Sequence, residues 1–155
     1  MQKEKTILVI ILIMVISTLH SCSDYKNLDY SKITNIDLSI NGGMEQSFRF
    51  KFDKSKMEAN IVHFLNGDNR SKIENWTEEK FNNFICDLEK CNIEKWTGDY
   101  IVEDSHDMFE WRLQLKNDKE TIIEIKGVGK HPNFFDWNRY IDVLSEYVNP
   151  AIAQY

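Results

Sequence analysis

Alternating hydrophobic and polar positions predict β-strands in the first part of the chain. Ile36, Leu38 and Ile40 alternate with polar residues, and residues 48–52 alternate aromatic with basic side chains. A period of two residues is typical of a strand with one buried face. Residues 41–43 contain two glycines and predict a turn between these strands. A third strand is expected within residues 57–65, which residues 67–69 close.

A helix is predicted next, because the large hydrophobic residues then follow a helical spacing. Either Asn75 or Thr77 is expected to be its N-cap, and the glutamates at 78 and 79 favour the positive end of the helix dipole. We expect this helix to end near Cys91. One buried stripe is predicted from the residues at i, i+3, i+4 and i+7, which are Phe81, Phe84, Ile85 and Leu88.

The second half of the chain shows the same order of patterns. Strands are predicted at residues 100–102, 109–115 and 121–126, with a hairpin turn at residues 117–118 between the last two. A second helix is expected to begin at Pro132 and Asn133 and to stop before Pro150. Its predicted buried stripe consists of Phe134, Trp137, Ile141, Leu144 and Val148.

These elements predict an α+β domain, with an antiparallel sheet of about six strands and two helices on one face. Each half reads as three strands followed by a helix, and residues 48–52 resemble residues 109–113 in their alternation. A duplicated βββα unit is therefore one hypothesis for the architecture.

The N-terminal segment has the features of an export signal. Lys3 and Lys5 precede the uninterrupted apolar run of residues 7–16. A run of this length fits the hydrophobic region of a signal peptide, which takes about 7 to 15 residues, whereas a membrane-spanning helix needs about 20. Leu19, His20, Ser21 and Cys22 then resemble the lipobox of bacterial lipoproteins.

This resemblance implies that the chain is cut before Cys22, that the Cys22 thiol is diacylated, and that the protein is held on a membrane of the bacterial cell envelope, facing the periplasm or the exterior. It predicts a signal peptide over residues 1–21 and a flexible tether over residues 22–34. Residues 35–150 then form a single domain.

Charge narrows the classes of partner. The 155 residues carry a net charge of −6, and removal of residues 1–21 would take away two lysines and one glutamate, leaving −7. An acidic domain argues against a nucleic-acid partner and against a polybasic contact with anionic lipid. The membrane is therefore expected to be contacted through the lipid on Cys22, and no cofactor is indicated.

Two loops hold the candidate ligand-binding residues. Residues 103–107 bring together Asp104, His106 and Asp107, which with His131 are weak candidates for a metal site. The EF-hand pattern is absent, however, and the histidines lack the spacing of a zinc motif. A solvated connection between strands is the favoured interpretation of residues 103–107.

The second loop, residues 127–131, superficially resembles a phosphate-binding loop. A Walker A motif would need glycine where Glu124 stands and serine or threonine where His131 stands, so the match fails. Its glycines favour a simple strand-to-helix connection. The stretch from Gly127 through Tyr140 also resembles a glycine-x-x-x-x-proline-aromatic segment of small uncharacterised bacterial proteins, a resemblance that implies no function.

The remaining cysteines and nucleophiles predict no catalytic residue. Cys86 and Cys91 would point about 140° apart on one helix, which favours two separate thiols. A disulfide remains an alternative if the helix ends before Cys91. The sequence contains neither a C-x-x-C pair nor a G-x-S-x-G motif.

Two hypotheses for function follow. The favoured one is a non-enzymatic binding module tethered at the cell envelope, in one version an inhibitor or immunity-type protein that neutralises a basic partner. Such a module would bind through an open face or an edge of the sheet. The alternative is a small envelope hydrolase or a ligand- or metal-binding protein that uses the loops at residues 103–107 and 127–131.

Overall fold

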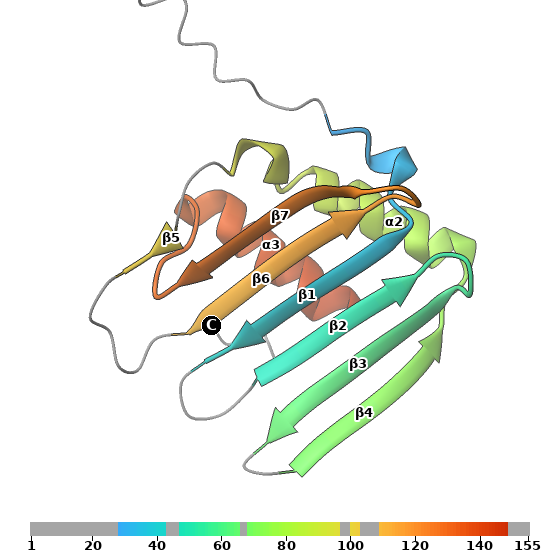
Figure 1. The fold of residues 1–155 in the computed structure, drawn as a ribbon, viewed down its shortest axis with the longest axis horizontal. Coiled ribbons are helices and arrows are strands. Elements are labelled where there is room, and N and C mark those ends of the chain that lie inside the picture. Colours follow the sequence, from blue (N-terminus) through green and yellow to red (C-terminus); the bar gives the residue numbers. More distant parts are fainter. Residues whose placement is uncertain (1–27, 43–46, 66–67, 97–99, 103–108, 149–155) are drawn as a thin grey trace, which may run out of the picture.

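A computed structural model describes residues 28–42, 47–65, 68–96, 100–102 and 109–148, which form one seven-stranded sheet (Figure 1). The strands follow one another across the sheet in the order β4-β3-β2-β1-β6-β7-β5. Their bounds are β1 Asn35–Asn41, β2 Ser47–Asp53, β3 Glu58–Leu65, β4 Asp68–Asn75, β5 Tyr100–Ile101, β6 Glu110–Lys116 and β7 Thr121–Val128.

The first strand of the domain occupies the centre of the sheet. β1 pairs antiparallel with β2 on one side and with β6 on the other, so that Leu38 lies opposite both Phe50 and Leu113. Strands β1 to β4 form an antiparallel meander, and β7 adds antiparallel to β6. The short strand β5 is the exception, because it pairs parallel with β7.

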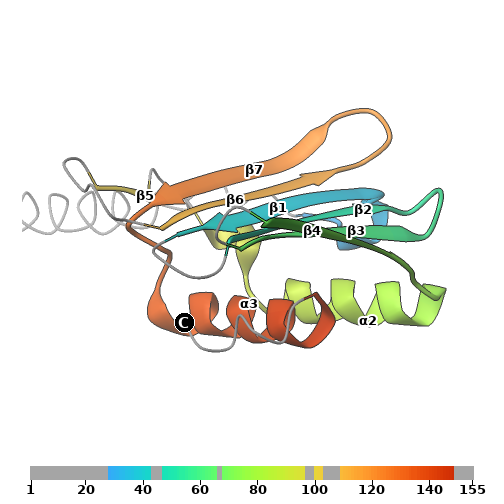
Figure 2. The same cartoon turned by 90° about the horizontal axis from the view of Figure 1, so that it is seen from below.

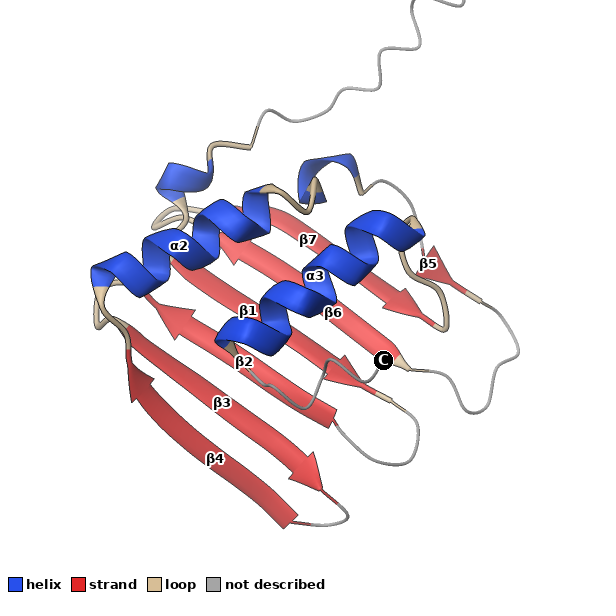
Figure 3. Cartoon of the chain, turned by 180° about the vertical axis from the view of Figure 1, so that it is seen from behind, coloured by secondary structure: helices blue, strands red, loops and turns tan. Residues whose placement is uncertain are grey.

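Two helices cover one face of the sheet (Figures 2 and 3). They are α2, Glu78–Glu89, and α3, Phe134–Tyr147. Leu38, Phe50 and Leu113 face them and are completely buried. Aromatic rings fill much of the interface: Phe52 stacks on Phe81 with 4.7 Å between ring centroids. The predicted α+β class, with two helices on one face, is confirmed.

The predicted strand count was wrong, because the sequence pattern missed β4. This strand has hydrophilic residues on both faces except for Ile73. It lies at the edge of the sheet, and neither helix covers it (Figure 3). No face of β4 is therefore fully buried, and the alternation of hydrophobic and polar residues that reveals a strand is absent.

The two halves also differ in how their strands connect. Four strands precede α2 and three precede α3, whereas the βββα hypothesis requires three before each helix. In the first half consecutive strands are neighbours, but β5 pairs with β7 rather than with β6. The sheet therefore does not reproduce a simple repeat of a three-strand unit.

The domain also begins earlier than expected. A short 3-10 helix, η1, spans Tyr30–Lys32, and Tyr30 and Ile33 are buried in the core. The Tyr30 hydroxyl donates a hydrogen bond to Glu94 at 2.9 Å, which fixes this segment to the chain beyond α2. Residues 30–33 thus pack on the domain instead of forming part of the tether predicted over residues 22–34.

Both helices begin at a side-chain cap. Thr77, rather than Asn75, is the N-cap of α2, since its hydroxyl oxygen accepts a hydrogen bond from the Lys80 amide at 3.1 Å. Asn133 caps α3 in the same way through the Asp136 amide. The predicted stripe of α3 needs one correction: Phe134 is 65% exposed, because it lies in the first turn of α3, outside the part of the helix that packs on the sheet.

Candidate functional site

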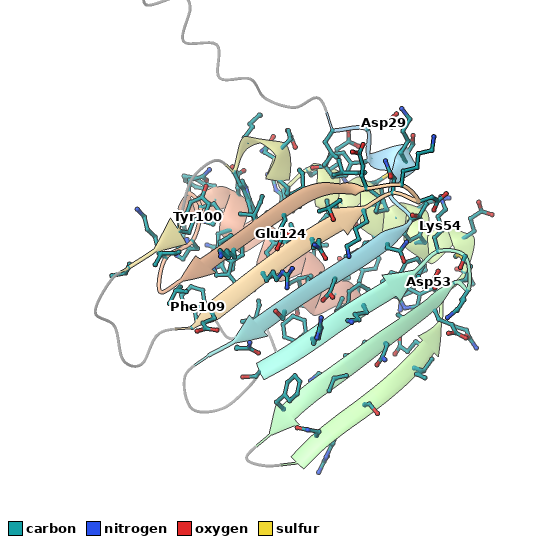
Figure 4. The ribbon with its side chains drawn as sticks, in the orientation of Figure 1. Asp29, Asp53, Lys54, Tyr100, Phe109 and Glu124 are labelled. Carbon is teal, nitrogen blue, oxygen red and sulfur yellow. The ribbon has the colours of Figure 1, made fainter. Side chains whose placement is uncertain are left out.

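The face of the sheet opposite the helices carries no helix in the described part of the chain, and we call it the open face (Figure 4). Because side chains alternate along a strand, the residues between the buried positions of each strand point to this face. Their registers place Asp37 of β1 beside Lys51 of β2 and Gln114 of β6, with Glu124 of β7 next along the same row.

The open face is densely charged but balanced. Asp37 lies on the central strand β1. Glu124 is visible on β7 in Figure 4. Acidic and basic residues occur in equal number on its strands, so the net negative charge of the chain lies elsewhere. The basic residues are Arg49, Lys51, Arg112, Lys116 and Lys126, and the acidic residues are Asp37, Asp53, Glu58, Glu110 and Glu124.

Hydrogen-bonded ion pairs hold these side chains in place. Arg49 donates from Nε and Nη2 to the two carboxylate oxygens of Asp37, at 3.1 and 2.7 Å, and this pairing raises the pKa of Arg49. Arg112 donates to Glu124 at 2.7 Å, and the buried Gln114 amide donates to the other oxygen of Glu124 at 3.1 Å. A bidentate pair fixes the direction of both groups, so the face presents an ordered set of charges.

Two shallow hollows flank Asp37 on the open face. One, of about 370 Å³, is bordered by Lys51, Asn60, Ile73 and Lys116. The other, of about 420 Å³, is bordered by Arg49, Phe64, Arg112 and Lys126. Each combines charged groups with an exposed apolar side chain, a composition suited to contact with another protein surface.

The apolar part of the open face lies on the last two strands of the meander. Val62 and Phe64 of β3 are two positions apart, and Ile73 of β4 lies diagonal to Val62. Phe64 is 38% exposed and Ile73 66% exposed. We call these three residues the apolar stripe.

The residues that flank the first predicted loop, Val102 and Phe109, both contact the second loop. The Val102 amide donates to the Val128 carbonyl at 3.0 Å, and the Gly129 amide donates to the Phe109 carbonyl at 2.8 Å. Both ends of the first loop are thus fixed beside the second loop. Asp104, His106 and Asp107 themselves lie outside the described residues.

His131 is placed for packing. Its ring stacks on Trp137 with 5.2 Å between centroids and 11° between planes, and Nδ1 lies 2.7 Å from the Pro132 carbonyl oxygen. Among the described residues no three His, Cys, Asp or Glu side chains are grouped as ligands for a metal ion.

The glycines of the second loop have structural roles. A side chain at Gly127 would collide with the Trp111 ring and the Lys130 carbonyl, and Gly129 has a positive φ of 64°. The Trp111 indole donates to that same Lys130 carbonyl at 2.8 Å, which fixes the turn into α3. The interpretation of residues 127–131 as a strand-to-helix connection is therefore supported.

A third hollow, of about 310 Å³, lies on the helix side beneath β3 and β4 and beside the end of α3. Its lining includes His63, Glu74 and Tyr147. Burial lowers the pKa of His63, whereas hydrogen bonds from Lys72 and Lys80 lower the pKa of Glu74. The charged groups of this hollow mostly form ion pairs with one another, which makes the hollow a weaker candidate for a binding site than the open face.

No protein-family model matches the chain, and no curated protein matches it. Within the described residues, no helix has both the length and the hydrophobicity needed to cross a membrane.

The sequence predicted a sheet with one open face, but it did not predict which residues form the binding surface on that face. The alternation in β1 and β2 places Asp37 and Arg49 on the polar side of the sheet, yet their pairing depends on which strands are neighbours. Ile73 of the apolar stripe was missed because β4 was missed. An isolated isoleucine in a polar segment is the only sequence signal for this position.

Proposed function

We propose that this chain is a lipoprotein of a bacterial cell envelope, anchored through Cys22, whose domain binds a partner protein through the open face. The anchor is supported by residues 7–16 and by the lipobox-like residues 19–22. Two acyl chains hold a protein on a membrane stably, whereas one gives only marginal binding.

The observation that carries the binding role is the open face itself. It combines ordered ion pairs with the exposed apolar stripe, and no helix of the described chain covers it. Protein interfaces pair a hydrophobic centre with a polar rim. A partner with alternating charges and an apolar contact for Phe64 and Ile73 fits this surface.

An inhibitor or immunity-type protein is one concrete form of this role. The charge balance of the open face narrows the expected charge of the partner's contact surface. A uniformly basic surface is disfavoured there, because it would meet five cations as well as five anions. The excess negative charge on the rest of the domain would speed the approach of a basic partner instead. The alternative function, a hydrolase or metal-binding protein, gains no support from His131, which packs on Trp137.

The anchor is tested by intact mass and detergent partitioning of the full chain from a bacterial host. We expect a detergent-phase product that begins at Cys22 and carries acyl mass, and we expect Cys22→Ala to abolish both properties. A soluble product cut at another position would refute the anchor without affecting the binding face.

The binding face is tested by placing a photoreactive amino acid at single positions of the full chain in the envelope of its bacterium. Ser39 and Val62 probe the open face, and Asn82 and Asp142, which are exposed on α2 and α3, serve as matched controls. We expect a cross-linked product of defined mass from the open-face positions only. The same product from all four positions, or none from Ser39 and Val62, would contradict this assignment.

A further inference from the structure

Among the described residues, no strand pairs with the outer edge of β4. β4 spans Asp68–Asn75, and within that part of the chain it pairs only with β3. The helices lie over other strands of the sheet, and β4 extends beyond them (Figure 3). The unpaired amide and carbonyl groups of such an edge can pair with a strand of another chain.

The sequence of β4 complements itself in an antiparallel arrangement. Lys72 and Glu74 are two positions apart and share the helix side of the strand, while Ile73 between them faces the open side. If two copies of β4 run antiparallel with Ile73 opposite Ile73, each Lys72 lies opposite Glu74 of the other copy. Opposite charges and hydrophobic residues placed directly across two strands both stabilise the pair.

The symmetric registers centred on Arg70, Ser71, Lys72 or Glu74 place like charges opposite each other, and registers centred nearer the ends of β4 pair at most three of its residues. The two copies are related by a two-fold axis perpendicular to the sheet, so the open faces of both copies lie on the same side. Each residue of β4 must therefore lie opposite a residue that points to the same face. Centring on Lys72 puts Lys72 opposite Lys72, and centring on Ser71 puts Arg70 opposite Lys72. Centring on Arg70 puts Arg70 opposite itself. Like charges directly opposite are destabilising, which favours the register centred on Ile73.

We propose that two copies of this chain pair through the outer edges of β4, antiparallel and centred on Ile73, to form one continuous sheet. Each copy contributes Ser71 to Asn75. The pairing places the two apolar stripes side by side and covers part of Ile73, which is 66% exposed in the single chain. It depends on the β4 edge alone and not on the partner-binding role proposed for the open face.

The test uses disulfide cross-linking of the purified full chain in detergent, under mild oxidation, in a Cys86→Ser background that removes the one thiol exposed among the described residues. In this register the two Cα atoms at position 73 are about 4.5 to 5.5 Å apart, within the range of a disulfide. Ser71 lies opposite Asn75, so its two copies are roughly 13 Å apart. We expect Ile73→Cys to give severalfold more disulfide-linked dimer than the matched control Ser71→Cys.

Charge reversal then tests the register independently. Adding Lys72→Glu to the Ile73→Cys chain places carboxylates opposite each other and should reduce the dimer severalfold. The Lys72→Glu chain is then mixed with an Ile73→Cys chain that carries Glu74→Lys, so that opposite charges again face each other. Recovery of the cross-linked dimer would show that Lys72→Glu removed the contact and did not unfold the chain. Equal cross-linking at positions 71 and 73, no cross-linking at 73, or no effect of Lys72→Glu would overturn the proposal.

Discussion

A hydrogen bond between Tyr147 and Asp87 joins the ends of the two helices. The Tyr147 hydroxyl donates to Asp87 at 2.7 Å, and the Lys90 ammonium donates to the other oxygen of the same carboxylate at 2.6 Å. The bonds from Lys90 and Tyr147 lower the pKa of Asp87. Burial and the Asp87 carboxylate raise the pKa of Tyr147 to about 12.

Replacing Tyr147 with phenylalanine is expected to lower the free energy of unfolding by about 1 kcal/mol at neutral pH, the usual contribution of one hydrogen bond. The difference from the wild type should shrink at both extremes of pH. The stabilisation from Asp87 is lost as pH falls through its lowered folded-state pKa. The stabilisation from Tyr147 is present below about pH 10 and is lost as pH rises towards about 12.

Urea unfolding of both proteins across this pH range measures the effect. Asp87→Ala and the double variant complete a cycle that isolates the pairwise energy from other effects of each substitution. A Tyr147→Phe difference that stays constant from acid to alkaline pH would show that the hydrogen bond contributes nothing.

The two cysteines illustrate a prediction at the scale of single residues that was correct. Both thiols are free, with Cys86 exposed and Cys91 buried. Burial raises the pKa of Cys91 to about 12, and its thiol donates to the Asp87 carbonyl at 3.4 Å. The thiols are separate although α2 ends at Glu89, before Cys91, so the helical angle on which the prediction rested does not extend to Cys91.

At the scale of elements, the start of α2 depends on one side chain. Thr77→Ala should lower the free energy of unfolding by about 1 kcal/mol, because the Lys80 amide loses its acceptor. Asn75→Ala is the matched control: Asn75 is exposed at the end of β4, and its loss should change stability by less than about 0.5 kcal/mol. Chemical denaturation measures both variants, and equal losses would contradict the assignment of Thr77 as the cap.

Three elements that were predicted correctly, β1, β2 and α2, have one face that is wholly buried. β1, β2 and α2 each carry their hydrophobic residues at the period of the element, since each packs against the core. β4 does not, and it could not be predicted from its own residues. Its position follows instead from its pairing with β3.

The candidate site was harder to predict than the fold. Residues 103–107 and 127–131 attracted attention because they concentrate polar groups, but His131 packs on Trp137. The open face is built from six strands, β1 to β4, β6 and β7, and its ion pairs depend on a strand order that only the folded sheet reveals. Local sequence patterns carry no information about which distant strand becomes a neighbour.

At the scale of the whole molecule, the sheet should differ in stability from its centre to its edge. β1 is paired on both sides and covered by helices on one face, whereas β4 has one free edge and no helix over it. We expect hydrogen–deuterium exchange, followed by mass spectrometry at low protein concentration, to be slowest in β1 and β6 and fastest among the long strands in β4. Exchange in β4 as slow as in β1 would contradict this gradient.

The central position of β1 also has a consequence for the order of folding. β1 is the first strand of the domain to be synthesised, yet its second neighbour is β6, and Asn35 meets Lys116 across that pair. Closing so long a loop is slow, because its entropy is lost before the contact is gained. The middle of the sheet therefore stays incomplete until most of the chain has been made. A nascent chain of this kind stays unfolded for longer, as the export proposed for this chain would require.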